Sequence, residues 1–259
     1  MSSLSPSAYS NFGPPPIRMM EIVTGPPAVR LLQQSGLLAD ERRGLAVLDL
    51  ASGAGVMTSV IKAQRDDVNV VMSDVDAGVL ELAKKRAEEG GWENVEIKEA
   101  NALDLPFDAA SFDYVFVNLG VQFFPDQAKA LSEIHRVLRP ASTLSYTAWL
   151  TVPFLTLLQR ADPSFSPPLA FSSPLSTRAS LASFLAAAGF ASEVHVEEVE
   201  VRYKWESAER FVEDMRKGMK GLFSDEERNK RMVGILKEEN GEGEVEMVWE
   251  GLAVTARKA

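Results

Sequence analysis

Short apolar runs alternate with amphipathic stretches between residues 45 and 150. The runs that predict strands are 45–50, 68–73, 95–98, 112–117 and 142–149. The stretches that predict helices are 56–64, 77–89 and 126–138, the last ended by Arg139-Pro140. In the second of these helices, Val79, Leu80 and Ala83 lie at helical spacing beside a charged face. Such alternation is typical of repeated βαβ units, which predicts an α/β fold with a mostly parallel sheet.

The segment before this region has a different texture. Residues 1–16 are rich in Ser and Pro, so they predict an extended arm. Residues 17–38 predict two short helices, broken at Gly25-Pro26-Pro27 because proline ends one helix and opens the next. We therefore expect 1–44 to be an arm with helices over the active site, attached to a main domain 45–259.

The segment after residue 150 interrupts the alternation. Residues 151–177 are rich in Pro, Ser and Phe without a clear period, which predicts a loop or lid. A helix over 177–188 and a strand over 194–203 follow. A helical insertion over 206–240, made of two charged amphipathic helices, precedes a final strand over 245–256.

Composition excludes several classes of function. The 27 Lys and Arg against 37 Asp and Glu give a formal charge of −10, which disfavours a nucleic-acid partner because phosphate binding needs clustered positive charge. The absence of cysteine and the presence of only two histidines argue against a metal centre. No apolar run approaches the roughly 20 residues that crossing a bilayer needs, and the first residues do not resemble a secretory leader. We expect a cytoplasmic protein with no membrane span.

The most informative segment is Val47-Leu48-Asp49-Leu50-Ala51-Ser52-Gly53-Ala54-Gly55. A strand here enters a glycine turn and then a helix, which brings bare backbone and a helix N-terminus to a ligand. The next predicted strand ends at Asp74, where a carboxylate can accept both hydroxyls of a ribose. Two acids at strand ends around a glycine turn favour a nucleoside-containing ligand at the carboxyl edge of the sheet.

Two other interpretations of this segment compete. The turn can join strand and helix with no ligand at all. A dinucleotide site is the second alternative, but it needs a third glycine where Thr58 stands. Asp49 is of little use beside a pyrophosphate and suits an ammonium or sulfonium, which favours S-adenosylmethionine over NAD.

Taken in order, VLDLASGAG, VVMSDVDAGVLELAKKRA and NVEIKEANALDLPFDAASFDYVFVNLGVQFFPDQAKALSEIHRVLRP resemble the class I S-adenosylmethionine-dependent methyltransferases. The resemblance covers roughly residues 45–150 and is to the small-molecule branch typified by ubiquinone and menaquinone methyltransferases. It implies a Rossmann-like, seven-stranded, mostly parallel sheet with an antiparallel last strand. The predicted strands 194–203 and 245–256 are consistent with that topology, and the N-terminal arm and helical lid insertions would be additions to it.

The resemblance also implies a set of cofactor-binding residues. The loop from Asp49 to Gly55 would surround the methionine portion of the cofactor, and Asn118 with Leu119 would lie beside that end and the entering substrate. Asp74 would hold the ribose, Val75 would pack on adenine, and Asn101 with Ala102 would meet the adenine amino edge. The complete set is Asp49, Ala51, Ser52, Gly53, Gly55, Asp74, Val75, Asn101, Ala102, Asn118 and Leu119. The alternatives are that Val75 and Leu119 are core residues and that Asn101 only caps a turn.

Three positions depart from the family pattern. The family usually has glycine at Ala51, aspartate at Asn101, and a Gly-Gly pair at Ala141-Ser142. We expect Ala51 to be tolerated only with a negative φ, because its methyl would otherwise strain the turn. Asn101 keeps an acceptor and adds a donor, so it can still pair with an adenine edge.

Gln122, in the turn after the fourth strand, is the candidate for a catalytic group on the substrate side, and its alternative role is that of a helix-start residue. We expect His135 to be a packing residue and His195 a sheet residue. The substrate pocket should be apolar and aromatic. Its candidates are Tyr9, Phe12, Met19, Met20, Phe123, Phe154, Phe171 and Phe223.

These residues favour a small hydrophobic acceptor. The first hypothesis is methyl transfer to oxygen, with nitrogen or carbon as the alternative acceptor atoms. The second keeps the bound cofactor but catalyses a rearrangement or dehydration without methyl transfer. The third is a non-enzymatic binding module, and an NAD oxidoreductase ranks last. A homodimer is compatible with the sequence.

Overall fold

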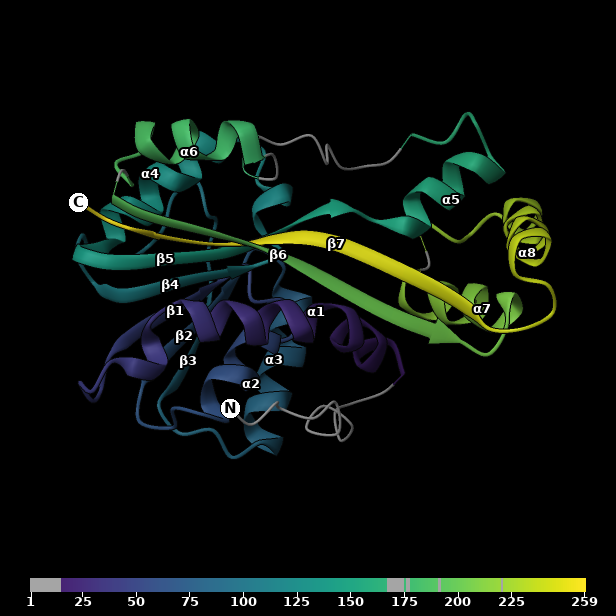
Figure 1. Ribbon diagram of the computed structural model, residues 1–259. Coiled ribbons are helices and arrows are strands. Elements are labelled where there is room, and N and C mark those ends of the chain that lie inside the picture. Colours follow the sequence, from purple (N-terminus) through teal and green to yellow (C-terminus); the bar gives the residue numbers. More distant parts are fainter. Residues whose placement is uncertain (1–14, 167–174, 176–177, 191, 220) are drawn as a thin grey trace. The chain divides into compact units, whose positions relative to one another are not determined.

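The computed structural model describes residues 15–166, 175, 178–190, 192–219 and 221–259 (Figure 1). A seven-stranded sheet has the order β3-β2-β1-β4-β5-β7-β6. Its strands are β1 (Ala46–Leu50), β2 (Asn69–Asp74), β3 (Val95–Glu99), β4 (Phe112–Asn118), β5 (Leu138–Thr151), β6 (Ser192–Trp205) and β7 (Val245–Arg257). The first five are paired in parallel, as predicted. The chain moves from β1 to β2 on one side and later returns to β4 on the other, so the switch point of the sheet lies at the ends of β1 and β4.

The last strand is antiparallel to its neighbours. Along β5 and β7, Ser142 meets Lys258 and Ser145 meets Thr255, so the residue numbers run in opposite directions. Between β6 and β7, Glu193 pairs with Arg257, whereas Lys204, further along β6, pairs with Glu244 before the start of β7. The residue numbers of these two strands therefore also run in opposite directions. The α/β fold class predicted from the sequence is therefore confirmed.

Three helices connect the parallel strands, and two of them begin with an aspartate cap. They are α2 (Val56–Lys62), α3 (Ala77–Glu89) and α4 (Gln127–Val137), with a short η3 (Val121–Phe123) before α4. Asp76 accepts hydrogen bonds from the amides of Gly78 and Val79 at the start of α3, and Asp126 accepts one from Lys129 at the start of α4. These aspartates satisfy amides that have no partner inside a helix.

The prediction of two short helices over 17–38 is wrong. One helix, α1 (Pro15–Gln34), continues through Pro26 and Pro27, and η2 (Leu37–Ala39) follows it. Proline removes the donors that would bond the carbonyls four residues earlier, but its fixed φ is compatible with a helix. The buried face that includes Leu31 and Leu32 outweighs that local loss.

Part of the expected lid, 151–177, is also a regular helix. Helix α5 (Pro153–Ala161) begins with proline, which is favoured at the first helical position, and it buries Leu155, Leu157 and Leu158. This helix contacts α8 (Glu226–Asn240), where Arg231 donates to the Ala161 carbonyl at 2.6 Å. The two charged helices expected over 206–240 are confirmed as α7 (Ala208–Gly218) and α8. A further helix, α6 (Arg178–Ala187), precedes β6.

The chain divides into two compact units. One contains 1–23, 151–170 and 200–250, and the other contains 24–150, 171–199 and 251–259. The carboxyl ends of β1 to β4 belong to the second unit. The boundary at 44/45 that the sequence suggested stays a prediction. Within the described ranges, no helix combines the length and apolar character needed to cross a membrane.

Ala51 corrects another expectation, because its φ is +54° and not negative. The left-handed region costs a residue with a Cβ about 1–2 kcal/mol. The facing loop after β4 makes room for this conformation: a Cβ on Gly120 would lie 2.6 Å from the Cβ of Ala51 and 2.9 Å from Cγ1 of Val117. The methyl of Ala51 therefore occupies space that only a glycine at position 120 leaves open.

This packing predicts a non-additive pair of substitutions. Gly120→Ala should lower the free energy of unfolding by about 1–3 kcal/mol through overpacking. In the double variant with Ala51→Gly, a large part of that loss should be recovered, as urea denaturation of the four proteins would measure. Gly234→Ala on α8, whose added Cβ meets nothing within 4 Å, is the control and should not destabilise the protein. Additive effects at positions 51 and 120 would contradict the assigned contact.

Candidate functional site

The turn after β1 contains three left-handed residues. Ala51 and Gly53 have φ of +54° and Gly55 has +79°. The amide of Ser52 donates to the Ser73 carbonyl at 2.9 Å, which ties the turn to the end of β2. A Cβ on Gly55 would lie 2.9 Å from Sδ of Met72, so close packing against β2 requires this glycine. At Gly53 a Cβ would meet only Val79, at 4.0 Å, so this backbone faces more open space.

Asp74 links the two turns at this edge of the sheet. Its Oδ2 accepts from the Gly53 amide at 2.9 Å and its Oδ1 accepts from the Asp76 amide at 3.1 Å. Each oxygen keeps a second lone pair. Val75, the next residue, is 68% exposed, which excludes the alternative that it is a core residue.

Asp49 lies at the end of β1 and is completely buried. Its Oδ2 accepts from the Thr58 amide at 3.0 Å and from the Thr58 hydroxyl at 2.6 Å. Burial raises the pKa of Asp49 to about 7; the hydrogen bonds from Thr58 oppose the rise and the charge of Asp74 adds to it. This carboxyl is therefore poised between its neutral and charged forms near neutral pH.

Polar atoms without a partner gather around the same turn. Among the described residues, Oδ1 of Asp49, Oγ of Ser52 and Oγ of Ser73 are buried and have no hydrogen-bond partner. Unpaired buried polar atoms cost free energy, so these three atoms can stabilise a ligand that offers them hydrogen-bond donors. A carboxylate oxygen and a hydroxyl beside an open glycine backbone fit a ligand that carries both hydrogen-bond donors and a positive charge.

The loops after β3 and β4 complete this edge. Asn101 accepts from the Leu103 amide at 2.9 Å, so it caps a turn, and Ala102 beside it is buried. Asn118 donates to the Thr24 carbonyl at 3.1 Å and accepts from the Thr147 hydroxyl at 2.7 Å. Leu119 is buried with a φ of +60°, and these constraints fix the direction of the loop after β4.

Both polar groups of the Gln122 side-chain amide form hydrogen bonds with the main chain of Trp149. It donates to the Trp149 carbonyl at 2.9 Å and accepts from the Trp149 amide at 2.8 Å. Gln122 is also only 6% exposed. This geometry is that of a residue that ties η3 to the end of β5, and it gives no support to the prediction that Gln122 meets the substrate.

The aromatic candidates fall into separate groups. Phe123, at the end of η3, is 62% exposed. In the other unit the rings of Phe154 and Phe223 lie 6.2 Å apart, and Phe223 is buried. Tyr9, Phe12 and Phe171 lie outside the described residues, as do the side chains of Met19 and Met20.

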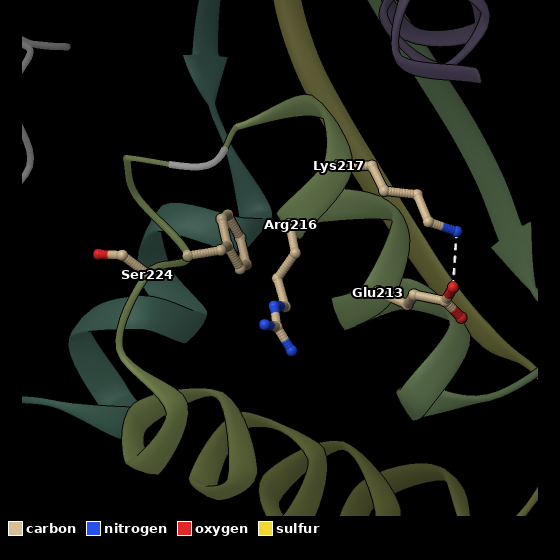
Figure 2. Close-up of a pocket in the computed structure, with 5 residues that line it drawn as sticks. Glu213, Arg216, Lys217 and Ser224 are labelled. Carbon is tan, nitrogen blue, oxygen red and sulfur yellow. Dashed lines mark hydrogen bonds and ion pairs between the residues drawn. The ribbon is translucent and has the colours of Figure 1, made fainter. Parts of the chain in front are cut away.

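Phe223 borders a hollow of about 470 Å³ on α7 and the segment after it. Figure 2 shows Arg216 and Ser224 on this hollow and the ion pair between Lys217 and Glu213, which the structure places at 2.6 Å. Arg216 is paired with Glu226 at 2.6 Å. Both cations at this hollow are therefore already neutralised.

The two histidines have the expected structural roles. His135 packs edge-on against Phe190 with ring centroids 5.3 Å apart, and burial lowers its pKa. His195 is exposed on β6 and contacts Glu197 at 2.8 Å.

Sequence reasoning missed the residues that hold these groups in place. The sequence singles out Thr58 only as the place where a dinucleotide motif would have its third glycine, yet Thr58 is the hydrogen-bond partner of Asp49. Thr58 lies in the first turn of the helix that follows the strand containing Asp49, and this position is the sequence signal for a contact between the two. Thr147 lies 29 residues from Asn118, and no local pattern points to that contact.

Comparison with known proteins agrees with this geometry. Residues 34–160 match the model of the ubiE/COQ5 methyltransferase family. The methyltransferase tpcH of Aspergillus fumigatus is 30% identical over 137 residues, which are 51% of this chain and 49% of that protein. A demethylmenaquinone methyltransferase of Thermus thermophilus is 39% identical over 107 residues, 41% of this chain and 48% of that protein. The chain spans about half the length of these curated relatives.

The fold extends the similarity beyond the matched segment. The crystal structure of a putative methyltransferase from Bacillus halodurans superposes with a TM-score of 0.63 at 19% identity, covering 89% of this chain and 98% of that one. The resemblance indicated by the ordered motifs is confirmed. Residues 34–160 are thus similar in sequence to the ubiE/COQ5 methyltransferase family, and the chain has the fold of the putative methyltransferase from Bacillus halodurans.

Proposed function

We propose that this chain transfers a methyl group from S-adenosylmethionine to a small hydrophobic acceptor, with oxygen as the acceptor atom. The observation that carries the proposal is the buried, unpartnered Oδ1 of Asp49 beside the open backbone of Gly53, at the switch point of a sheet in this family. An acid and a bare backbone at this place suit a cationic nucleoside ligand.

The residues at the strand ends divide the ligand between them. Asp74 has lone pairs left for ribose hydroxyls, and the exposed side chain of Val75 offers an apolar surface for adenine. Asn101 and Ala102 would meet the adenine edge. The turn from Ala51 to Gly55, with Ser52 and Gly53, would enclose the methionine portion together with Asp49, Asn118 and Leu119.

The bound sulfonium supplies an activated methyl group. The contribution of the chain is then to align the acceptor and exclude water, and ideal positioning can be worth up to about 7–11 kcal/mol. A phenol or enol acceptor loses its proton readily, so such a reaction needs no strong general base. This reasoning favours oxygen over nitrogen or carbon, and the exposed Phe123 suits an apolar acceptor.

Binding of the cofactor tests the first half of the proposal. Titration calorimetry with S-adenosylmethionine should detect binding, and Asp74→Ala should weaken it by about 10- to 100-fold because charged hydrogen bonds to the ribose are lost. Asp108→Ala, at an exposed position between β3 and β4, should leave the affinity unchanged. If the wild-type protein binds NADH in preference to S-adenosylmethionine, the assignment fails.

Turnover tests the second half. Incubation with phenolic and enolic compounds should give products heavier by one methylene group, together with demethylated cofactor, as mass spectrometry would detect. Products of unchanged mass with intact cofactor would instead support a rearrangement or dehydration. Binding without any turnover would favour a binding module.

The role of Gln122 has its own test. Gln122→Ala leaves the buried main-chain groups of Trp149 unpaired, so it should lower the free energy of unfolding by about 2–4 kcal/mol. Gln64→Ala at an exposed position is the control and should have little effect. A positioning role is contradicted if urea denaturation shows unchanged stability while kcat falls.

A further inference from the structure

Asp49 presents a buried acid without a counter-ion. It is fully buried at the end of β1, and none of the ion pairs formed among the described residues includes it. Its Oδ2 is held by Thr58, whereas its Oδ1 has no partner. A carboxylate in such a place is unfavourable unless a cation or further donors reach it.

The groups packed around Asp49 do not provide that cation. Its partners on the adjacent strands are Met72 of β2 and Phe116 of β4, which carry no charge. From α2 it receives the two hydrogen bonds of Thr58. The charge that acts on it from the end of β2 is the negative Asp74. Arg86 of α3 reaches the same loop but donates to the Ala54 carbonyl at 2.8 Å.

We propose that Asp49 holds a proton in the free protein and releases it when the cationic end of S-adenosylmethionine binds, so that the carboxylate becomes the counter-ion of the ligand. The inference rests on the proposed cofactor site. The O–H bond of the carboxyl breaks, the proton passes to the buffer, and its electron pair stays on the carboxylate; no oxidation or reduction takes place. Oδ2 keeps its hydrogen bonds to Thr58 throughout.

The proposal makes cofactor affinity depend on pH in a defined direction. The raised pKa of Asp49, about 7, places the change near neutrality. Because the charged form binds the cation, the dissociation constant should fall severalfold between about pH 6 and about pH 7.5, below the range in which the ligand's α-amine loses most of its own protons. Close to one proton should be released per cofactor at about pH 6, and almost none at about pH 8.5.

Titration calorimetry of the full chain measures this directly. Binding of S-adenosylmethionine is followed in buffers with different ionisation enthalpies, and the slope of the observed enthalpy gives the number of protons released. Asp49→Asn is the matched control, because its amide has nearly the shape of the carboxyl group but has no proton to release in this pH range. The variant should bind more weakly at high pH, with an affinity that no longer follows the titration, and should release fewer protons.

Thr58→Val tests the titration of Asp49 while leaving the carboxyl group itself in place. The Thr58 hydroxyl stabilises the charged carboxylate, so its removal should raise the pKa of Asp49 and extend proton release to higher pH.

Two analogues of the cofactor identify which cation is the partner of Asp49. S-adenosylhomocysteine keeps the ammonium and lacks the sulfonium, and methylthioadenosine lacks both. Release with S-adenosylhomocysteine would identify the ammonium as the partner, whereas release with S-adenosylmethionine alone would identify the sulfonium.

The ligand-free protein provides a second readout. The folded-state pKa lies above the unfolded value of about 4, so the wild type should lose stability as pH rises from about 4 to about 7 and show no further loss from this group above that. Asp49→Asn has no carboxyl group at this position, so it should not show this loss of stability. The Tm of the variant minus the Tm of the wild type should therefore increase as the pH rises from about 4 to about 7.

The outcomes are distinct for the two proposals. Failure to bind S-adenosylmethionine at any pH overturns the proposed function and this inference with it. Binding with the same proton count in wild type and Asp49→Asn, or a Tm difference that does not change with pH, overturns only the inference.

Discussion

The burial of one carboxyl group at the end of β1 organises the cofactor edge of this protein. Asp49 is completely buried, and the amide and hydroxyl of Thr58, in the first turn of α2, donate to its Oδ2. The turn that joins the strand to the helix has then to reverse in a few residues, which the left-handed backbone at Gly53 and Gly55 makes possible. The other oxygen of Asp49, Oδ1, stays without a hydrogen-bond partner at this end of the strand, and the proposed cation site rests on it.

Local patterns predicted the strands well because each parallel strand is a short buried run between amphipathic helices. They failed at α1, where the proline pair is a strong local signal that burial of Leu31 and Leu32 overrides. The φ of Ala51 depends on Gly120, which lies in another loop, and the partner of Gln122 is 27 residues away. Acids at strand ends could be placed from the sequence, whereas the contacts that orient them depend on the three-dimensional packing of distant segments.

The segment that matches the family contains the strand ends of the candidate site, whereas α7 and α8 lie outside that segment. Residues 34–160 contain the strand ends and the turn that the family shares. The segments with α7 and α8 lie beyond that match, and their surfaces are covered by exposed ion pairs such as Arg216 with Glu226 and Lys217 with Glu213. Exposed pairs of this kind contribute little to stability. The buried contacts of α5 with α8 are therefore the better explanation for the cohesion of that helical unit.

The contact between Ala51 and Gly120 also bears on how such a site can evolve. Each residue limits what the other can be, although they are far apart in the sequence. A lineage that first exchanges the glycine for a larger residue passes through a crowded intermediate, whereas one that first replaces the alanine with glycine does not. The order of mutations therefore matters, and relatives with glycine at the first position should tolerate more variation at the second.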